Sequence, residues 1–297
     1  MIERRRLFCS DSARVRGDDN VATAARVDVW ILVELPCTWG REPMTDAALP
    51  PAVRETLERA EHEIPRSRVI FIRKRVEPPR ECRVYLARSS PTPGVLPLDL
   101  PSIDEVATVP FAALAAEPFP AVERPLILIC THGQHDSCCG RRGYPLFDAL
   151  RERPEIDLWQ CSHIGGDRFA ANALVLPWGI YYGPVEPREA EQLVTSVLRN
   201  EILLAAYRGR SSMSRPVQAA ETFVRRATNI AGRDAFRLLR RETLVDGRIR
   251  IHLREAGGTL HEVTIEHFIE SEDAYTTCSS RKSQPIRQFR LVQHAIH

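Results

Sequence analysis

Cysteine and histidine residues, which can bind metal, gather in two short stretches of this chain. The first stretch is Cys130-Thr-His-Gly-Gln-His-Asp-Ser-Cys138-Cys139, and the second is Trp159-Gln-Cys161-Ser-His163-Ile-Gly-Gly-Asp167. Four of the eight cysteines lie within residues 130–161. Thiolates and imidazoles held in loops among glycines are the donors that a soft metal ion or an iron–sulfur cluster needs. The clustering therefore predicts a redox or metal site.

The elements around these stretches should hold the donors in place. Pro125–Cys130 is a short apolar run that predicts a buried strand, and Ile156–Cys161 predicts a second one. A helix is expected between them over Tyr144–Arg153, with Pro145 acceptable in its first turn. If the second strand continues through Cys161 and His163, these two side chains share one face. The two glycines at 165 and 166 then allow a tight turn beside a bound group.

The order of the predicted elements indicates the fold class. After the strands named above, strands over 173–177 and 180–182 and a long helix over 187–207 complete a β-α-β-β-β-α order, which is close to the thioredoxin plan. An earlier set, a strand at 27–35, a helix at 46–62 and strands at 68–73 and 82–87, predicts a smaller α/β sandwich. A Cys-Thr-x-Gly string follows a strand at Cys37–Gly40 and again at Cys130–Gly133, which hints at duplication. We therefore expect an α/β (α+β) protein: a thioredoxin-like two-lobed αβ sandwich.

Four segments follow from this pattern. The first lobe spans 1–88, a proline-rich connector spans 89–124 with at most one short helix at 111–116, and the thioredoxin-like second lobe, which holds the metal-binding stretches, spans 125–210. Residues 211–297 should form a small C-terminal helix-plus-hairpin module. Its expected elements are helices at 216–228 and 234–241 and a hairpin of 248–254 with 259–267. Beyond Ser271 the polar sequence is expected to fray.

The two metal-binding stretches resemble the sucrase/ferredoxin-like family, within the wider group of thioredoxin-like [2Fe-2S] ferredoxins. In cluster-binding eukaryotic members, two cysteines nine residues apart and a His-x-Gly-Gly-His string supply the ligands. The resemblance implies that Cys130, Cys139 and His163 bind a [2Fe-2S] cluster. The second histidine of the family string is Asp167 here, as in bacterial branches. The resemblance is strong over 125–205, weaker over 21–90 and absent beyond 210.

The fourth ligand is open among Asp167, Cys161, Cys138 and an external group. Two further histidines, His132 and His135, are expected to be loop or second-sphere residues. A basic rim is expected to face an acidic redox partner protein, whose identity the sequence does not give. That rim consists of Arg141, Arg142 and Arg168.

The bulk composition describes a globular protein without special surface charge. Of 297 residues, 43% are hydrophobic and 27% charged, and the net charge is +2. This balance gives no global attraction to nucleic acid or membrane, and no apolar run approaches a membrane span. A cytoplasmic location is expected, where thiols stay reduced or bind metal. Cys9, Cys82 and Cys278, isolated in sequence, are interpreted as free, partly buried thiols.

Three functions compete on these observations. The first is electron transfer by a [2Fe-2S] cluster, which favours a carrier over a catalyst. The second is a zinc or thiol site, in which ligand exchange could open a position for hydrolysis; the absence of a Cys-x-x-Cys string argues against dithiol exchange. The third is a non-redox binding module with a degenerate metal site. Nothing in the sequence marks the carboxylate pair of a glycosidase.

Overall fold

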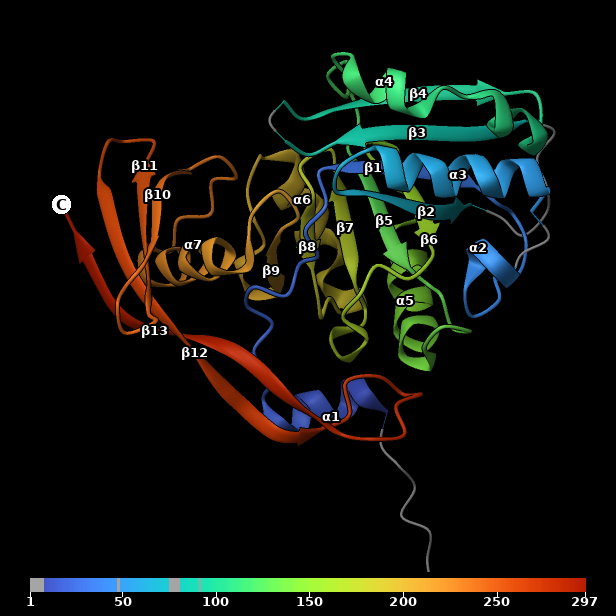
Figure 1. Ribbon diagram of the computed structural model, residues 1–297. Coiled ribbons are helices and arrows are strands. Elements are labelled where there is room, and N and C mark those ends of the chain that lie inside the picture. The colour runs from blue at the N-terminus through green and yellow to red at the C-terminus, as the bar shows by residue number, and fades with distance from the viewer. Residues whose placement is uncertain (1–7, 47–48, 75–80, 91) are drawn as a thin grey trace, which may run out of the picture.

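The computed structural model describes residues 8–46, 49–74, 81–90 and 92–297. Two α/β lobes form the larger part of the molecule, and a C-terminal unit projects from one side (Figure 1). The first lobe contains β1 (Val29–Glu34), α2 (Pro43–Asp46), α3 (Pro51–Glu63), β2 (Ser67–Arg73), β3 (Cys82–Arg88), β4 (Gly94–Leu100), the 3-10 helix η1 (Ile103–Thr108) and α4 (Phe111–Ala116). The second contains β5 (Leu126–Cys130), α5 (Ser137–Leu150), β6 (Asp157–Cys161), η2 (Asp167–Phe169), β7 (Ala173–Leu176), β8 (Ile180–Tyr182), η3 (Pro187–Glu189), α6 (Ala190–Leu198), η4 (Leu204–Ala206) and β9 (Tyr207–Arg210).

The two lobes repeat one strand plan. Within the described residues, the strands form one nine-stranded sheet in the order β4-β3-β1-β2-β6-β5-β7-β8-β9. In each lobe the first two strands are parallel and joined by a helix, and the next two pair antiparallel beside the first. The lobes meet through an antiparallel pairing of β2 with β6. The α/β class and the two lobes predicted from the sequence are confirmed, and the repeated order agrees with the expected duplication.

The core lies in three apolar layers, because alternate residues of each strand face opposite sides of the sheet. One layer, which includes Ile31 and Leu57, packs β1–β4 against α3 and α4. Another, which includes Leu146 and Leu193, packs β5–β8 against α5 and α6. Between them the inner faces of the two lobes pack on each other, with Trp30 and Tyr181 in contact at a ring-centroid distance of 6.1 Å. The sheet therefore folds back on itself at the β2–β6 junction, and the molecule has four layers in the order helix, sheet, sheet, helix.

Helix α5 begins seven residues earlier than the sequence pattern predicted. Gly140, Gly143 and Pro145 have low helix propensity and conceal its first turns. The side chain of Asp136 caps the helix by accepting a hydrogen bond from the Cys138 N–H at 2.8 Å, and burial of Leu146 and Leu150 holds the later turns. The earlier start places Cys138 and Cys139 on the helix rather than in a loop.

The proline-rich segment over 89–124 is more regular than predicted. Its expected helix, Phe111–Ala116, is present as α4. The segment also contains β4, which pairs along its whole length with β3, and the 3-10 helix η1. Pro97 lies on this edge strand, where the missing N–H costs no ladder hydrogen bond. The segment therefore completes the first lobe.

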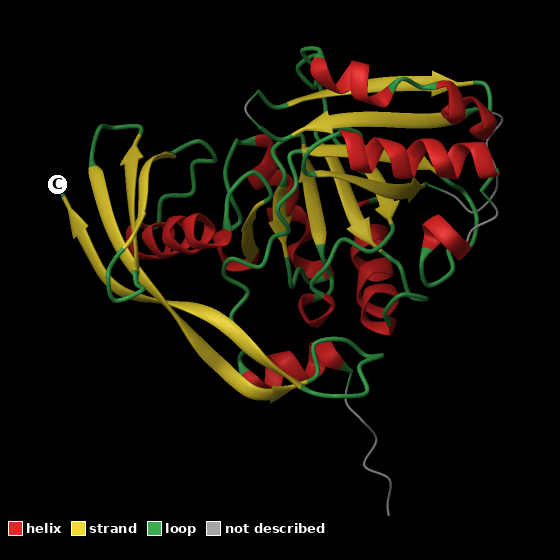
Figure 2. Cartoon of the chain, in the orientation of Figure 1, coloured by secondary structure: helices red, strands yellow, loops and turns green. Residues whose placement is uncertain are grey.

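The C-terminal unit differs most from expectation. It contains α7 (Arg215–Thr228) and a sheet of β10 (Phe236–Thr243), β11 (Ile249–Glu255), β12 (Leu260–Ala274) and β13 (Gln284–Ile296). The expected hairpin is present as β11 and β12, but the helix expected over 234–241 is wrong, because residues 236–241 belong to the edge strand β10. Fraying beyond Ser271 is also wrong. Among the described strands, the far half of β12 pairs with β13 alone, and the two form an arm that reaches α1 (Cys9–Arg16), as Figure 2 shows.

A buried ionic network joins the C-terminal unit to the second lobe. Glu221 of α7 accepts hydrogen bonds from the Tyr207 hydroxyl at 2.7 Å and from Arg225 at 2.9 Å, and all three side chains are buried. Burial raises the pKa of Glu221, but Arg225 and Arg210 more than offset this effect and lower it.

In the part of the chain that the structure describes, no helix is both long and apolar enough to cross a bilayer.

Candidate metal centre

Cys130 and Cys161 end two adjacent parallel strands and lie side by side. They are paired in the β5–β6 register, and both side chains face the core between the lobes. Each is at most 1% exposed. Because β-strand geometry fixes the direction of a side chain, the sheet itself aims both thiols toward the same end of this core.

Cys139 approaches Cys130 because α5 packs closely on the end of β5. Gly143 makes this approach possible, since a methyl group at that position would overlap the Cys130 carbonyl oxygen. Hydrogen bonds from Cys139 and Cys161 hold the pKa of Cys130 well below its usual range, while the shared hydrogen bond with Cys130 raises that of Cys139. The N-terminal end of α5 also favours negative charge at this point. Of these three thiols, Cys130 is thus the one that its neighbours hold as a thiolate.

His163 and Asp167 complete the group from the turn after β6. Gly165 and Gly166 have φ of +93° and +85°, the left-handed conformation that the sequence predicted for a tight turn. The turn brings Asp167 Oδ1 to 3.0 Å from His163 Nδ1 and 3.4 Å from Cys139 Sγ. Burial lowers the pKa of His163, but the Asp167 hydrogen bond and Cys130 more than offset this effect and raise it to about 9.

Donor distances divide the predicted ligands into those that meet and those that do not. Cys130, Cys139 and His163 have donor atoms within 4.8 Å of one another. The donor atoms of His135, His163 and Asp167 also lie within 4.8 Å of one another. Cys161 contacts Cys130 but belongs to neither group. The sulfur of Cys138 turns away, toward Cys9 and Cys278. His135 thus reaches His163 and Asp167, whereas Asp167 also contacts Cys139, and the sequence spacing gave no reason to expect His135 there.

The first lobe covers this centre with one loop. His132 accepts a hydrogen bond at Nδ1 from the His163 N–H at 3.1 Å, so its Nε2–H donates to the Gly40 carbonyl at 2.6 Å. Both nitrogens of His132 are therefore engaged, which fits the second-sphere place expected for it. The ring of His135 stacks on His163 at a centroid distance of 3.8 Å, and its Nδ1 contacts the Arg41 carbonyl at 3.2 Å. The loop that follows β1 thus orients the loop that follows β5.

A buried arginine adds positive charge beside the centre. Arg208 is 1% exposed and donates to Thr23 Oγ1, the Gly165 carbonyl and Asn172 Oδ1 at 2.7–3.1 Å. Within the described residues every one of its hydrogen-bond partners is neutral. Burial lowers the pKa of Arg208 to about 10, and Asp167 is among the acidic groups that oppose this shift. A buried cation of this kind suits a site that gains negative charge on binding.

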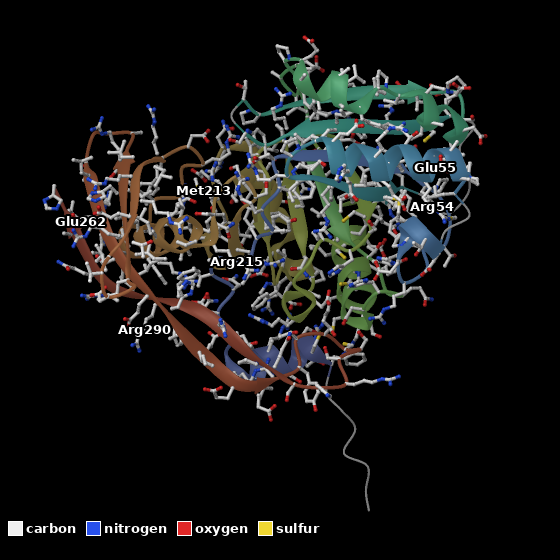
Figure 3. All side chains as sticks on the ribbon, viewed as in Figure 1. Arg54, Glu55, Met213, Arg215, Glu262 and Arg290 are labelled. Atoms are coloured by element: carbon white, nitrogen blue, oxygen red, sulfur yellow. The ribbon has the colours of Figure 1, made fainter. Side chains whose placement is uncertain are left out.

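A cavity of about 460 Å³ opens from the centre toward the C-terminal arm. Its lining includes His163, Asp167, Arg168 and Arg208 and also Arg215, labelled at the start of α7 in Figure 3. Residues 284–289 of β13 also line it. The His163 side chain is 19% exposed, whereas the Asp167 side chain is 4% exposed and the thiols are buried, so among these four donors the imidazole is the most exposed.

The donor set is chemically suited to iron or zinc. The two thiolates are soft donors and the imidazole is a borderline one, whereas the carboxylate is a harder donor that iron and zinc also accept. Mixed thiolate and imidazole ligation is known for [2Fe-2S] centres, and Cys-Cys-His with a fourth donor is a common zinc set. The residues present therefore fit a [2Fe-2S] cluster, with Asp167 or His135 as the fourth donor.

Comparison with known proteins identifies related sequences. The profile of a family described as Sucrase/ferredoxin-like matches residues 21–209. Altered inheritance of mitochondria protein 32 of Clavispora lusitaniae is 31% identical over 122 residues, covering 34% of this chain and 45% of that protein. The protein of the same name in Debaryomyces hansenii is 33% identical over 99 residues, covering 30% of this chain and 36% of that protein. The one in Eremothecium gossypii is 33% identical over 101 residues, covering 29% of this chain and 32% of that protein. The chain thus spans less than half the length of these curated relatives.

One similar solved structure is a thioredoxin-like [2Fe-2S] ferredoxin from Aquifex aeolicus. It is 19% identical, has a TM-score of 0.27, and the match covers 30% of this chain and 94% of that one.

Proposed function

Because this chain belongs to the sucrase/ferredoxin-like family, we propose that it is an electron-transfer protein with a [2Fe-2S] cluster in its second lobe. The proposed ligands are Cys130, Cys139, His163 and Asp167. The observation that carries the proposal is the meeting of two buried thiols and an imidazole, from three separate elements, within 4.8 Å. When bound, such a cluster accepts and releases single electrons.

The surrounding residues have distinct tasks in this proposal. The apolar core between the lobes keeps water from the thiols. Arg208 offsets the negative charge of the thiolates and Asp167, and so eases the uptake of an electron. His163, at the surface end, provides the shortest way out of the protein. An imidazole ligand raises the reduction potential relative to thiolates alone, whereas an aspartate lowers it. We expect a low-to-intermediate potential that changes with pH if the outer nitrogen of His163 titrates.

The proposal includes a redox partner protein that docks near His163. Of the basic rim expected from the sequence, Arg141 and Arg142 both pair with Asp11 of α1, at 3.0 and 2.5 Å. Arg168 lies 3.3 Å from Asp18. These pairs reduce the positive charge available to an acidic partner, so we expect weak attraction that depends on salt. A cytoplasmic location stays a prediction.

A single zinc ion at the same donors is the second candidate. Three donor atoms within 4.8 Å would also suit one tetrahedral ion. Metal analysis separates the candidates, since a zinc protein is colourless.

The test is anaerobic purification followed by visible absorption and by iron and sulfide analysis. About two irons and two sulfides per chain in a brown protein would support the cluster. Cys130→Ser and Cys139→Ser should then remove colour and iron, whereas Cys37→Ser, in the equivalent loop of the first lobe, should keep both. A colourless wild-type protein that contains one zinc per chain, together with loss of that zinc in Cys130→Ser, would establish the second candidate. Colourless, metal-free protein would refute both and favour a binding module.

The fourth ligand can be assigned with single variants of the coloured protein. Asp167→Ala, Cys161→Ser and His135→Ala each remove one donor near the centre. The variant that changes the absorption and electron paramagnetic resonance spectra while the fold is kept identifies the ligand. If Asp167→Ala leaves both spectra unchanged, Asp167 is not the ligand and only pairs with His163.

A further inference from the structure

A second group of thiols lies on the other side of the α5 N-terminus, outside the centre described above. Cys9 comes from α1, Cys138 from the first turn of α5, and Cys278 from the turn between β12 and β13. Their sulfurs form a triangle with sides of 3.5 Å (Cys9–Cys138), 3.3 Å (Cys138–Cys278) and 3.6 Å (Cys9–Cys278). The two longer sequence separations are 140 and 269 residues, so only the tertiary fold brings the three together.

A carboxylate completes the group. Asp136 Oδ1 and Oδ2 lie 3.8 and 3.9 Å from Cys9 Sγ, and one donor atom from each of the four residues fits within 4.8 Å. Zinc–sulfur bonds of about 2.3 Å at tetrahedral angles separate ligand sulfurs by roughly 3.8 Å. The observed sides of 3.3–3.6 Å are shorter than that value by about 0.5 Å or less. Three equivalent sulfurs with a carboxylate match one tetrahedral ion, whereas a disulfide would single out one pair.

Hydrogen bonds support the donors as they do around bound metals. Ser10 donates to Cys138 Sγ from its N–H at 3.5 Å and from its hydroxyl at 3.1 Å, and the Cys9 N–H donates to Cys278 Sγ at 3.5 Å. Asp136 is held by the N–H groups of Cys138 at 2.8 Å and Cys278 at 2.6 Å. N–H and O–H groups aimed at sulfur favour the thiolate, which is the form that binds metal.

The surroundings argue against a simple apolar contact. Among the described residues, the one apolar side chain that joins these three cysteines in a buried cluster is Ala170. Thiols used only as small apolar residues pack among aliphatic and aromatic side chains. In Figure 1, α1 and the tip of the arm lie together below the two lobes. A metal ion would give this corner the stability that it lacks in apolar contacts.

We propose that Cys9, Cys138, Cys278 and Asp136 bind one zinc ion, which fastens α1 and the C-terminal arm to the second lobe. The ion is structural, because all four positions are filled by protein donors. The proposal does not depend on electron transfer at the other centre. The two centres share one helical turn, since Cys138 and Cys139 are neighbours that point to opposite sides.

The test is zinc and iron analysis, by mass spectrometry, of the full chain purified from medium that contains both metals. We expect one zinc per chain that is lost in Cys9→Ser and in Cys278→Ser, while iron, sulfide and visible colour stay at the wild-type level. Cys82→Ser is the matched control, because that thiol is buried in β3 and its described partner is the Glu34 carbonyl. It should keep both metals. A colourless wild type that still carries this zinc would refute the iron–sulfur proposal and leave the present one standing.

A measurement on the wild type avoids the risk that a variant fails to fold. The chelated, reduced full chain is titrated with Co²⁺ alone, and tetrahedral thiolate ligation should give intense visible bands that Cys130→Ser retains. Wild-type protein without zinc, whether its thiols are free or joined in a disulfide, would overturn the proposal. Loss of iron and sulfide in Cys9→Ser and Cys278→Ser would also overturn it, because these residues would then serve a cluster.

Discussion

The ion pair of His163 and Asp167 should make the stability of the metal-free protein depend on pH, and Asp167→Asn should remove much of that dependence. The pKa of His163 rises from 6.5 to about 9 in the folded chain. At 1.36 kcal/mol for each tenfold change in the proton dissociation constant, this increase in pKa corresponds to about 3 kcal/mol. Burial acts against the shift, and the hydrogen bond to Asp167 is the largest influence that raises it, ahead of Cys130. We assign about 2 kcal/mol to Asp167.

The direction of the pH effect follows from the raised pKa. A histidine that holds its proton more tightly in the folded state contributes stability that is fully present below pH 6.5. That contribution is lost as the pH rises through about 9. Asp167→Asn should therefore be less stable than wild type by about 2 kcal/mol at pH 6, and the difference should shrink to about 0.5 kcal/mol or less at pH 9.5.

Urea unfolding of the chelated, reduced protein at both pH values measures this difference. Asp148→Asn is the control, because Asp148 pairs with Arg151 on the surface, where its side chain is 58% exposed. It should change stability little at either pH. A histidine titration by NMR gives an independent readout, in which the pKa of His163 falls toward 6.5 in Asp167→Asn. A difference in unfolding free energy that is the same at pH 6 and pH 9.5 would refute the reasoning.

The same pair controls metal uptake. Below pH 9 a metal ion must displace the proton of His163, and the raised pKa of Cys139 means that this thiol must lose its proton too, so apparent affinity should rise by at least about tenfold per pH unit until that pH.

Three further substitutions follow from the packing of the site. Gly143→Ala should lower stability by about 1–3 kcal/mol in urea unfolding and also lower bound iron, because the added methyl group pushes α5 away from Cys130. Arg208→Met should lower the reduction potential measured by spectroelectrochemistry, because it removes a buried cation beside the centre. Glu221→Gln should lower the unfolding free energy by about 3–5 kcal/mol, because Arg225 loses its buried partner.

Each of these changes has a control and a result that contradicts it. Gly257→Ala adds a methyl group with no neighbour closer than 3.8 Å and should leave the stability unchanged. If Gly143→Ala changes the stability no more than Gly257→Ala does, the packing argument is contradicted. Arg208→Lys keeps the charge, and a potential that falls as far as in Arg208→Met would exclude an electrostatic cause. Glu262→Gln changes a partly exposed carboxylate in the C-terminal sheet, labelled in Figure 3. If it lowers the unfolding free energy as much as Glu221→Gln does, the role of burial is contradicted.

Local apolar patterns were enough to predict most of the two lobes. Short buried runs such as Leu126–Cys130 and Ile180–Tyr182 carry a strong strand signal, and the order of elements then fixes the class. The strand β10 was mistaken for a helix because seven of its eight residues are not buried, so no alternation of apolar and polar residues marks it. Its strand conformation comes from pairing with β11, which a local pattern does not contain.

The candidate site was predictable to the extent that its residues are close in sequence. The stretches around Cys130 and His163 carry their own spacing, and the family resemblance adds to it. The place of His135 depends on the first-lobe loop at Arg41, which lies 94 residues away. The meeting of Cys9 with Cys278 depends on an arm that pairing between β12 and β13 builds. Contacts of this kind are properties of the tertiary fold.

The position of Cys278 in the arm sets an order of events during synthesis. Cys9 and Cys138 leave the ribosome first, and 140 residues separate Cys138 from Cys278. At about 5–20 residues per second, that interval lasts roughly 7–28 s. Throughout it, the thiols of Cys9 and Cys138 are exposed to oxidation and to other metals without their third partner. Closure of the arm over them is therefore a late event, and protection of these thiols would report that the chain has been made and folded as far as the arm.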